Sequence, residues 1–176
     1  SINICTRTLF PSASSGDGPF LNAEYIIRRE RQVHLSTSWP REDIEQGLRV
    51  REPWFYEYEF TNGARTEPQL AVVHEIHSDR ADAIFPHLDL LFSARWADVH
   101  CLDLACHEGW FSMHLAQRGA ASVVGIDLRA DHIEKARWIA EASETDNVHF
   151  QTVDLFAFAE QHTERYELVL CLGLLY

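Results

Sequence analysis

The sequence predicts an α/β fold, a doubly wound parallel sheet in the C-terminal half preceded by a helical and β-hairpin appendage. From residue 98 onward, short apolar runs alternate with helical patterns at regular spacing, as in βαβ units with right-handed crossovers. Before residue 98, helical patterns surround one run of alternating aromatic residues. We therefore expect an arm (residues 1–20), an appendage (21–97) and a sheet domain (98–176).

The arm and the start of the appendage are predicted to be irregular and then helical. The turn-forming run PSASSGDGP favours a mobile or irregular arm over residues 1–20. Residues 21–36 have a pattern compatible with a helix. A second helix is expected from Pro40, because proline suits a first helical position.

The rest of the appendage is predicted to contain a hairpin and two short helices. Residues 54–60 alternate with the period of a half-buried strand, and Asn62-Gly63 is a strong hairpin signal after it. Helical patterning covers residues 78–96 and contains Pro86, which predicts a break into two helices. The aromatic stripe of residues 54, 56, 58 and 60 favours a core role over a pocket wall, and a place in the lining of an acceptor site stays open as the alternative.

Four buried strands and three helices are expected in the sheet domain. The strands are short and largely apolar, as in strands covered on both faces, and comprise residues 99–106, 121–128, 148–155 and 166–176. The helices comprise residues 109–119, 129–143 and 156–162. Asp131 and Glu134 have capping-box spacing. Because the chain stops on the fourth strand, we expect about the first half of a larger domain, truncated there with an open edge.

The overall charge limits the kinds of partner. Fifteen basic and 27 acidic residues leave a formal charge of −12, which disfavours nonspecific binding to nucleic acid or anionic lipid. No apolar run reaches the roughly 18 residues of a membrane span, and we find no signal-peptide pattern of basic, apolar and small residues in the first residues given. Cysteines at 101, 106 and 171 lie in or beside apolar runs, which favours buried thiols and a reducing, cytoplasmic setting.

A candidate ligand site follows the first strand of the sheet domain, in the turn LDLACHEGWF (102–111). In doubly wound sheets, ligands bind at the carboxyl ends of the strands, where the strand order reverses. Asp127 and Asp154 follow the next two strands. Asp127 lies 22 residues beyond Ala105, close to the offset of about 20 expected for a ribose-binding carboxylate. Either aspartate alone would also suit a cap, but both in register favour binding.

The composition of the turn indicates which cofactor it suits. A pyrophosphate needs bare backbone at a helix N-terminus, whereas Cys106, His107 and Glu108 all carry side chains and Glu108 adds negative charge. A nucleoside without phosphate is favoured over a dinucleotide. S-adenosylmethionine is such a ligand, because its sulfonium is cationic.

The segment VHCLDLACHEGWFSMHLAQRGAASVVGIDL (99–128) resembles the opening of the class I S-adenosylmethionine-dependent methyltransferases. The first motif of that family runs acidic-x-Gly-x-Gly-x-Gly, and its positions here hold Asp103, Ala105, His107 and Gly109. Ala105 adds one methyl group, and His107 is the larger departure. The resemblance covers about residues 98–176.

This resemblance implies a Rossmann-like fold and a set of cofactor-binding residues. The turn would enclose the methionine part of S-adenosylmethionine. The residues implied at the other strand ends are Asp127 with Leu128 for the ribose, Asp154 with Leu155 for the adenine, and the backbone of Leu172 and Gly173 for the methionine amino group.

The acceptor is less defined than the cofactor. The fourth strand end lacks the Asn/Asp-Pro-Pro-aromatic segment of amino-adenine methyltransferases and the Pro-Cys nucleophile of cytosine-C5 enzymes. We expect O- or N-methyl transfer to a small-molecule or lipid-like acceptor. PWFYEYEFTNGART (53–66) and CLGLLY (171–176) more weakly resemble a branch that includes wobble-uridine tRNA enzymes, so tRNA is an alternative that the charge disfavours. An NAD(P)-dependent oxidoreductase and a noncatalytic methyltransferase-like scaffold also stay open.

No metal site or catalytic base is predicted. The run HEIH (74–77) lacks the His-Glu-x-x-His spacing of a zinc helix. His107 is interpreted as a polar loop residue that faces solvent or covers the cofactor, rather than as a base. The acceptor-binding loops are expected outside these residues, and the sequence predicts no oligomeric state.

Overall fold

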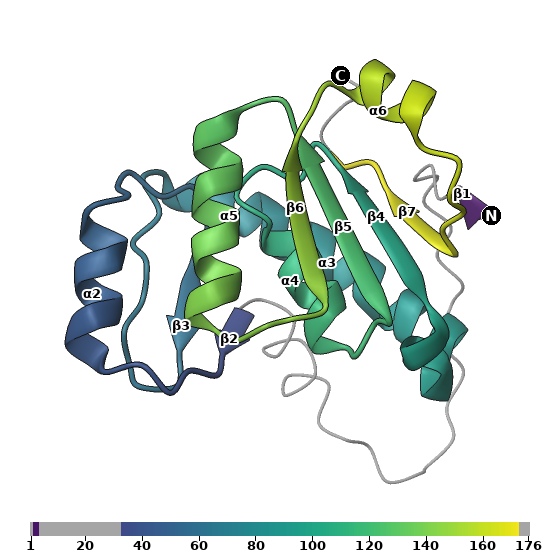
Figure 1. Ribbon diagram of the computed structural model, residues 1–176. Coiled ribbons are helices and arrows are strands. Elements are labelled where there is room, and N and C mark those ends of the chain that lie inside the picture. The colour runs from purple at the N-terminus through teal and green to yellow at the C-terminus, as the bar shows by residue number, and fades with distance from the viewer. Residues whose placement is uncertain (1, 4–32, 173–176) are drawn as a thin grey trace, which may run out of the picture.

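The computed structural model describes residues 2–3 and 33–172, apart from three side chains at the start of one helix (Figure 1). A five-stranded sheet runs in the order β1-β7-β4-β5-β6, and every neighbouring pair is parallel. Its strands are β1 (Ile2–Asn3), β4 (His100–Leu104), β5 (Ser122–Asp127), β6 (Val148–Thr152) and β7 (Leu168–Leu170). The strand order reverses between β4 and β7, and this confirms the predicted doubly wound, Rossmann-like sheet.

Helices cover both faces of the sheet. They are α4 (Trp110–Gln117), α5 (Ala130–Ala142) and α6 (Leu155–Gln161), each lying between two consecutive strands. Cys101 and Val123 point into the larger core with α4 and α5, whereas Leu102 and Ile126 point into a second core with Phe158 of α6. This alternation along β4 and β5 explains why both strands have apolar residues at consecutive positions.

The appendage packs against α4 and α5. Its elements are β2 (Val33–Leu35), α2 (Arg41–Arg49), β3 (Tyr58–Phe60), α3 (Ala71–Phe92) and the 3-10 helix η1 (Ser93–Asp98). Figure 1 shows α5 between α2 and the sheet. The side chains of Trp54, Tyr56, Tyr58 and Phe60 are buried, in agreement with the predicted core role of the aromatic stripe, and Tyr56 in addition lines a cavity. The Trp54 ring lies 6.4 Å from the Trp138 ring of α5.

The strand pairing of the appendage differs from the predicted hairpin. Residues 33–35 form a strand rather than the end of a helix, because Val33 and Leu35 are buried on either side of an exposed His34; residues 21–32 lie outside the described residues. The predicted strand 54–60 shortens to β3, which pairs in parallel with β2. Gly63 does form a turn, but the hairpin after it is reduced to one antiparallel bridge between Glu59 and Arg65.

Helix α3 runs through Pro86 without the predicted break. Proline removes one backbone hydrogen bond from a helix interior. Here the flanking side chains of Ala81, Phe85 and Leu88 are fully buried in the larger core. Their packing holds the helix together across the missing bond. None of the described helices has the length and apolar character that a membrane crossing requires.

Two details of the sheet domain also differ from prediction. The N-cap of α5 is Arg129 and makes no side-chain cap, so the predicted capping box is wrong and Asp131 lies in the first helical turn. The edge beside β7 is not open, because Ile2 and Asn3 pair with Leu168 and Val169. The rest of the predicted irregular arm, residues 1 and 4–20, lies outside the described residues.

Candidate functional site

The carboxyl ends of the parallel strands gather most of the predicted site residues along one edge of the sheet. Asp103, Ala105, His107 and Gly109 lie at the end of β4 and in the following turn, and Asp127 and Leu128 lie at the end of β5. Asp154 and Leu155 follow β6, and Leu172 follows β7. Gly173 lies outside the described residues.

The turn after β4 has a left-handed backbone at each of the three motif positions that hold glycine in the resembled family. Ala105, His107 and Gly109 have φ angles of +56°, +55° and +83°. Such angles are uncommon for residues other than glycine, with histidine among the more tolerant types. The turn therefore keeps a glycine-type backbone path although two of the three positions carry a side chain.

Asp127 holds this turn from the neighbouring strand. Its Oδ2 accepts a 3.0 Å hydrogen bond from the backbone N–H of His107, and its Oδ1 accepts one of 2.9 Å from the N–H of Arg129. The residue is only 6% exposed. A carboxylate with two oxygens has further lone pairs for ligand hydroxyls.

The ring of His107 lies between two other rings. It stacks on Phe55 of the appendage at 4.3 Å between centroids and on His132 of α5 at 3.6 Å. Burial and the nearby charges of His132 and Arg129 lower the pKa of His107 to about 2. The imidazole is therefore neutral at physiological pH and joins the appendage to the turn. Of the two predicted alternatives, the stacked and half-buried ring argues against a solvent-facing position, and covering of the cofactor stays a prediction.

Glu108 points into the protein and is paired there. The residue is 1% exposed, and its Oε1 lies 2.9 Å from Nζ of Lys135. Its Oε2 accepts hydrogen bonds from the backbone N–H groups of Phe55 and Tyr56. Because Lys135 balances its charge, Glu108 does not make the turn repel a phosphate, and that part of the sequence argument is wrong.

Asp103 is a buried carboxyl at the end of β4. Its Oδ2 accepts a 2.6 Å hydrogen bond from the hydroxyl of Ser112. Burial raises the pKa of Asp103 to about 7, although the bond from Ser112 acts in the opposite direction. The group is thus poised between its neutral and charged forms near neutral pH.

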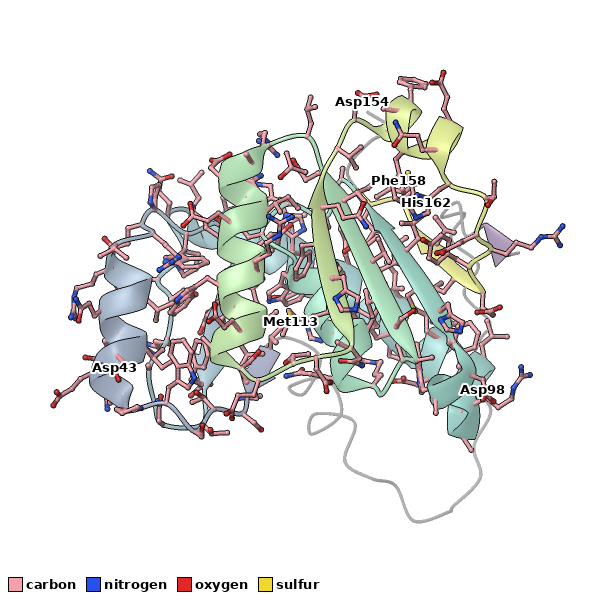
Figure 2. All side chains as sticks on the ribbon, viewed as in Figure 1. Asp43, Asp98, Met113, Asp154, Phe158 and His162 are labelled. Atoms are coloured by element: carbon pink, nitrogen blue, oxygen red, sulfur yellow. The ribbon has the colours of Figure 1, made fainter. Side chains whose placement is uncertain are left out.

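Asp154 is the N-cap of α6, and Figure 2 shows it at the beginning of that helix. Its Oδ1 accepts hydrogen bonds of 2.9 and 3.2 Å from the backbone N–H groups of Phe156 and Ala157. The capping role that the sequence left open is therefore present. Leu128 is 67% exposed and Phe156 is 77% exposed, so apolar side chains flank this part of the edge.

A cavity of about 210 Å³ opens beside the turn. Four predicted site residues line it: Asp103, Ala105, His107 and Leu172. Tyr56 also lines it, as the sequence left open for the aromatic stripe, whereas the lining side chains that sequence reasoning missed are Phe55, His77, Arg80, Cys106, Phe111 and Arg129.

Helix α3 supplies one of the charged side chains of the cavity wall, Arg80. Nη1 of Arg80 donates a 3.3 Å hydrogen bond to the carbonyl oxygen of Leu172, which brings a cation to the end of β7. The HEIH run (74–77) was the one sequence feature that drew attention to this part of the chain. It was considered only as a possible metal site, and His77 was not predicted to line a cavity. Within the described residues, no group of three or more His, Cys, Asp or Glu side chains could hold a metal ion.

Known proteins resemble parts of this chain. A family model described as a methyltransferase domain matches residues 97–176. A ubiquinone biosynthesis O-methyltransferase of Neisseria meningitidis is 27% identical over 107 residues, which are 61% of this chain and 42% of that protein. The bifunctional methyltransferase/kinase WbdD of Escherichia coli, an O-antigen chain terminator, is 39% identical over 64 residues, 36% of this chain and 9% of that protein.

A solved structure extends the similarity into the appendage. The N-terminal domain of EvdMO1, crystallised in the presence of SAH and D-fucose, is 26% identical with a TM-score of 0.57. The alignment covers 76% of this chain and 53% of that one. The matches thus span less than half of the Neisseria enzyme and about half of the EvdMO1 domain.

Proposed function

We propose that the protein binds S-adenosylmethionine along the carboxyl edge of its sheet and transfers the methyl group, as the match of residues 97–176 to a methyltransferase domain model supports. The observation that carries this proposal is the turn after β4. Its left-handed backbone at Ala105, His107 and Gly109 retains the path of a glycine motif, and a buried acidic side chain from the adjacent strand, Asp127, supports it.

The methionine part of the cofactor is proposed to occupy the cavity beside the turn. Arg80 offers a guanidinium for the carboxylate, a pairing that bidentate geometry strengthens. The backbone of Leu172 would face the amino group. Asp103 lies in the same cavity and adds negative potential near the cationic sulfonium.

The adenosine part is proposed to lie across the ends of β5 and β6. Asp127 would accept the ribose hydroxyls in addition to the two backbone bonds it already receives. The exposed side chains of Leu128 and Phe156 suit the two faces of a planar base. Asp154, with the backbone of Leu155, would contact the adenine edge, using Oδ2 because Oδ1 caps α6.

Methyl transfer from a sulfonium requires mainly that the protein align the two reactants. The sulfonium supplies an activated methyl group, so the protein has to hold the acceptor atom in line with it and exclude water. Phe55, Tyr56 and Phe111 give the cavity an apolar, aromatic wall for that purpose.

A small-molecule or lipid-like acceptor fits this wall best, with O- or N-methyl transfer as the reaction. The similarity to a ubiquinone biosynthesis O-methyltransferase supports transfer to an oxygen rather than to a nitrogen atom. A tRNA acceptor is second, because the charge of −12 opposes a polyanion. Free, buried thiols at Cys101 and Cys106 support a reducing, cytoplasmic compartment.

Isothermal titration calorimetry tests the proposal. The full-length protein should bind S-adenosylhomocysteine, and NADH should give no heat of binding at the same concentrations. Binding of NADH in place of S-adenosylhomocysteine would make the protein an oxidoreductase. A folded protein that binds neither compound would be a noncatalytic scaffold.

A further inference from the structure

The turn after β4 is fastened to the appendage through Glu108. Its carboxylate accepts the N–H of Phe55 at 2.9 Å and that of Tyr56 at 3.3 Å. Its backbone carbonyl accepts a 2.7 Å hydrogen bond from the hydroxyl of Tyr58. Lys135 of α5 completes the arrangement with a 2.9 Å ion pair. One buried residue thus joins three residues of the appendage that lie at least 50 positions away in the chain.

The residues on both sides of Glu108 also contact the short segment 55–58 of the appendage. The ring of His107 stacks on Phe55, and the ring of Trp110 stacks on Tyr56 at 5.7 Å with an interplanar angle of 9°. Nε1 of Trp110 donates a 3.1 Å hydrogen bond to the carbonyl of Glu57. A shift of residues 107–110 should therefore also shift the segment 55–58.

This segment is also a wall of the cavity. Phe55 and Tyr56 line it together with Ala105 and His107 of the turn. A ligand that orders the turn must therefore also order the aromatic wall. The reverse must hold as well, because the coupling free energy between two binding events is reciprocal.

A purely stabilising role is a poor explanation for Glu108. Burying a glutamate and a lysine costs several kcal/mol of desolvation, and well-packed apolar residues often serve stability as well or better. What the carboxylate adds is direction, because it accepts two consecutive backbone N–H groups and so sets the backbone of Phe55 and Tyr56 relative to the turn.

We propose that Glu108 is a positioning residue that couples cofactor binding at the turn to the order of the aromatic wall, so that a bound cofactor makes the wall of the acceptor pocket more rigid. The inference rests on the proposed function, since it takes the turn as the S-adenosylmethionine site. It goes further by linking acceptor binding to occupation of that site.

Hydrogen–deuterium exchange with S-adenosylhomocysteine tests the coupling without knowledge of the acceptor. In the wild-type protein, saturating ligand should slow exchange in the turn and, by about tenfold, at the amides of Phe55 and Tyr56. In the Glu108→Gln variant the turn should still be protected, whereas the two appendage amides should no longer respond. Glu67→Gln, a change at an exposed glutamate of the appendage, should behave like the wild type.

Each outcome decides a different point. Protection of the turn without any response at Phe55 and Tyr56 in the wild type would overturn the coupling and leave the proposed function standing, even if Glu108→Gln failed to fold. A full response in a folded Glu108→Gln variant would show that Glu108 is not the link. Absence of protection anywhere in the wild type, with no heat of binding, would remove the proposed function and this inference with it.

Discussion

The backbone N–H of His107 donates a 3.0 Å hydrogen bond to Oδ2 of Asp127, across the ends of two neighbouring strands. His107 stands where a glycine is expected and keeps a left-handed φ of +55°. Asp127 therefore supports a strained turn, and in our proposal the same carboxylate also holds the ribose.

Replacement of Asp127 should affect binding and stability together. In Asp127→Asn one oxygen becomes an amide donor, so the N–H of His107 or of Arg129 loses its acceptor. We expect S-adenosylhomocysteine affinity to fall by at least about tenfold and the free energy of unfolding by about 1–3 kcal/mol. Calorimetry and urea denaturation measure the two effects. Asp131→Asn, at an exposed site in the first turn of α5, should change neither; unaltered binding by Asp127→Asn would refute the ribose assignment.

The left-handed backbone at Ala105 predicts a stabilising glycine substitution. Ala105→Gly should raise the free energy of unfolding by up to about 1 kcal/mol, because the alanine methyl group strains a φ of +56°. Ala83→Gly is the matched control, since Ala83 is exposed within α3 and glycine there should cost about 1 kcal/mol. Changes of the same sign in urea denaturation would contradict the strain argument.

Alanine substitutions at Gly109 and Gly119 should distinguish the cost of backbone strain from the cost of a steric clash. Their φ angles are +83° and +82°. A Cβ atom on Gly109 would lie 2.6 Å from the Phe150 ring, whereas one on Gly119 would meet nothing within 4 Å. Gly119→Ala should therefore cost about 1 kcal/mol, and Gly109→Ala about 3 kcal/mol. Equal losses of thermal stability would show that Phe150 moves aside freely.

Arg80 should recognise the carboxylate of the methionine part and nothing else of the cofactor. Arg80→Met should weaken S-adenosylhomocysteine binding by about tenfold or more, since a charge-assisted pair is lost. The affinity for 5′-methylthioadenosine, which lacks the amino-acid group, should not change. A calorimetric loss of equal size for both ligands would mean that Arg80 acts on the fold of the site instead.

Burial of Asp103 predicts a pH dependence of stability. Its pKa is about 7 in the folded protein, above the ordinary value of 3.8, so the folded state binds the proton more tightly. The contribution of the Asp103 carboxyl to the free energy of unfolding is present at pH 4 and is lost as the pH rises to 7, because the group then ionises in its buried site. Relative to Asp103→Asn, the wild-type free energy of unfolding should fall by at most about 1.4 kcal/mol per pH unit over that range. A constant difference from pH 4 to 7 would place the folded pKa near the ordinary value.

Local sequence patterns were sufficient to predict the main strands and helices of the sheet domain. The strands β4, β5 and β6 and the helices between them follow from short apolar runs and helical periodicity, which depend on neighbours in the chain. The acidic residues at the strand ends follow from the same local reading, because parallel strands bring their carboxyl ends to one edge. The domain boundary at residue 98 stays a prediction.

Only the tertiary structure decided how the appendage meets the site. The pairing of β2 with β3, the continuity of α3 through Pro86, and the entry of Arg80 into the cavity depend on packing between distant segments. The same holds for Glu108, whose sequence position suggests a charge in the turn, whereas Phe55 and Lys135 make it a buried acceptor. Residues 53 and 27 positions away supply these contacts, and no local periodicity records such contacts.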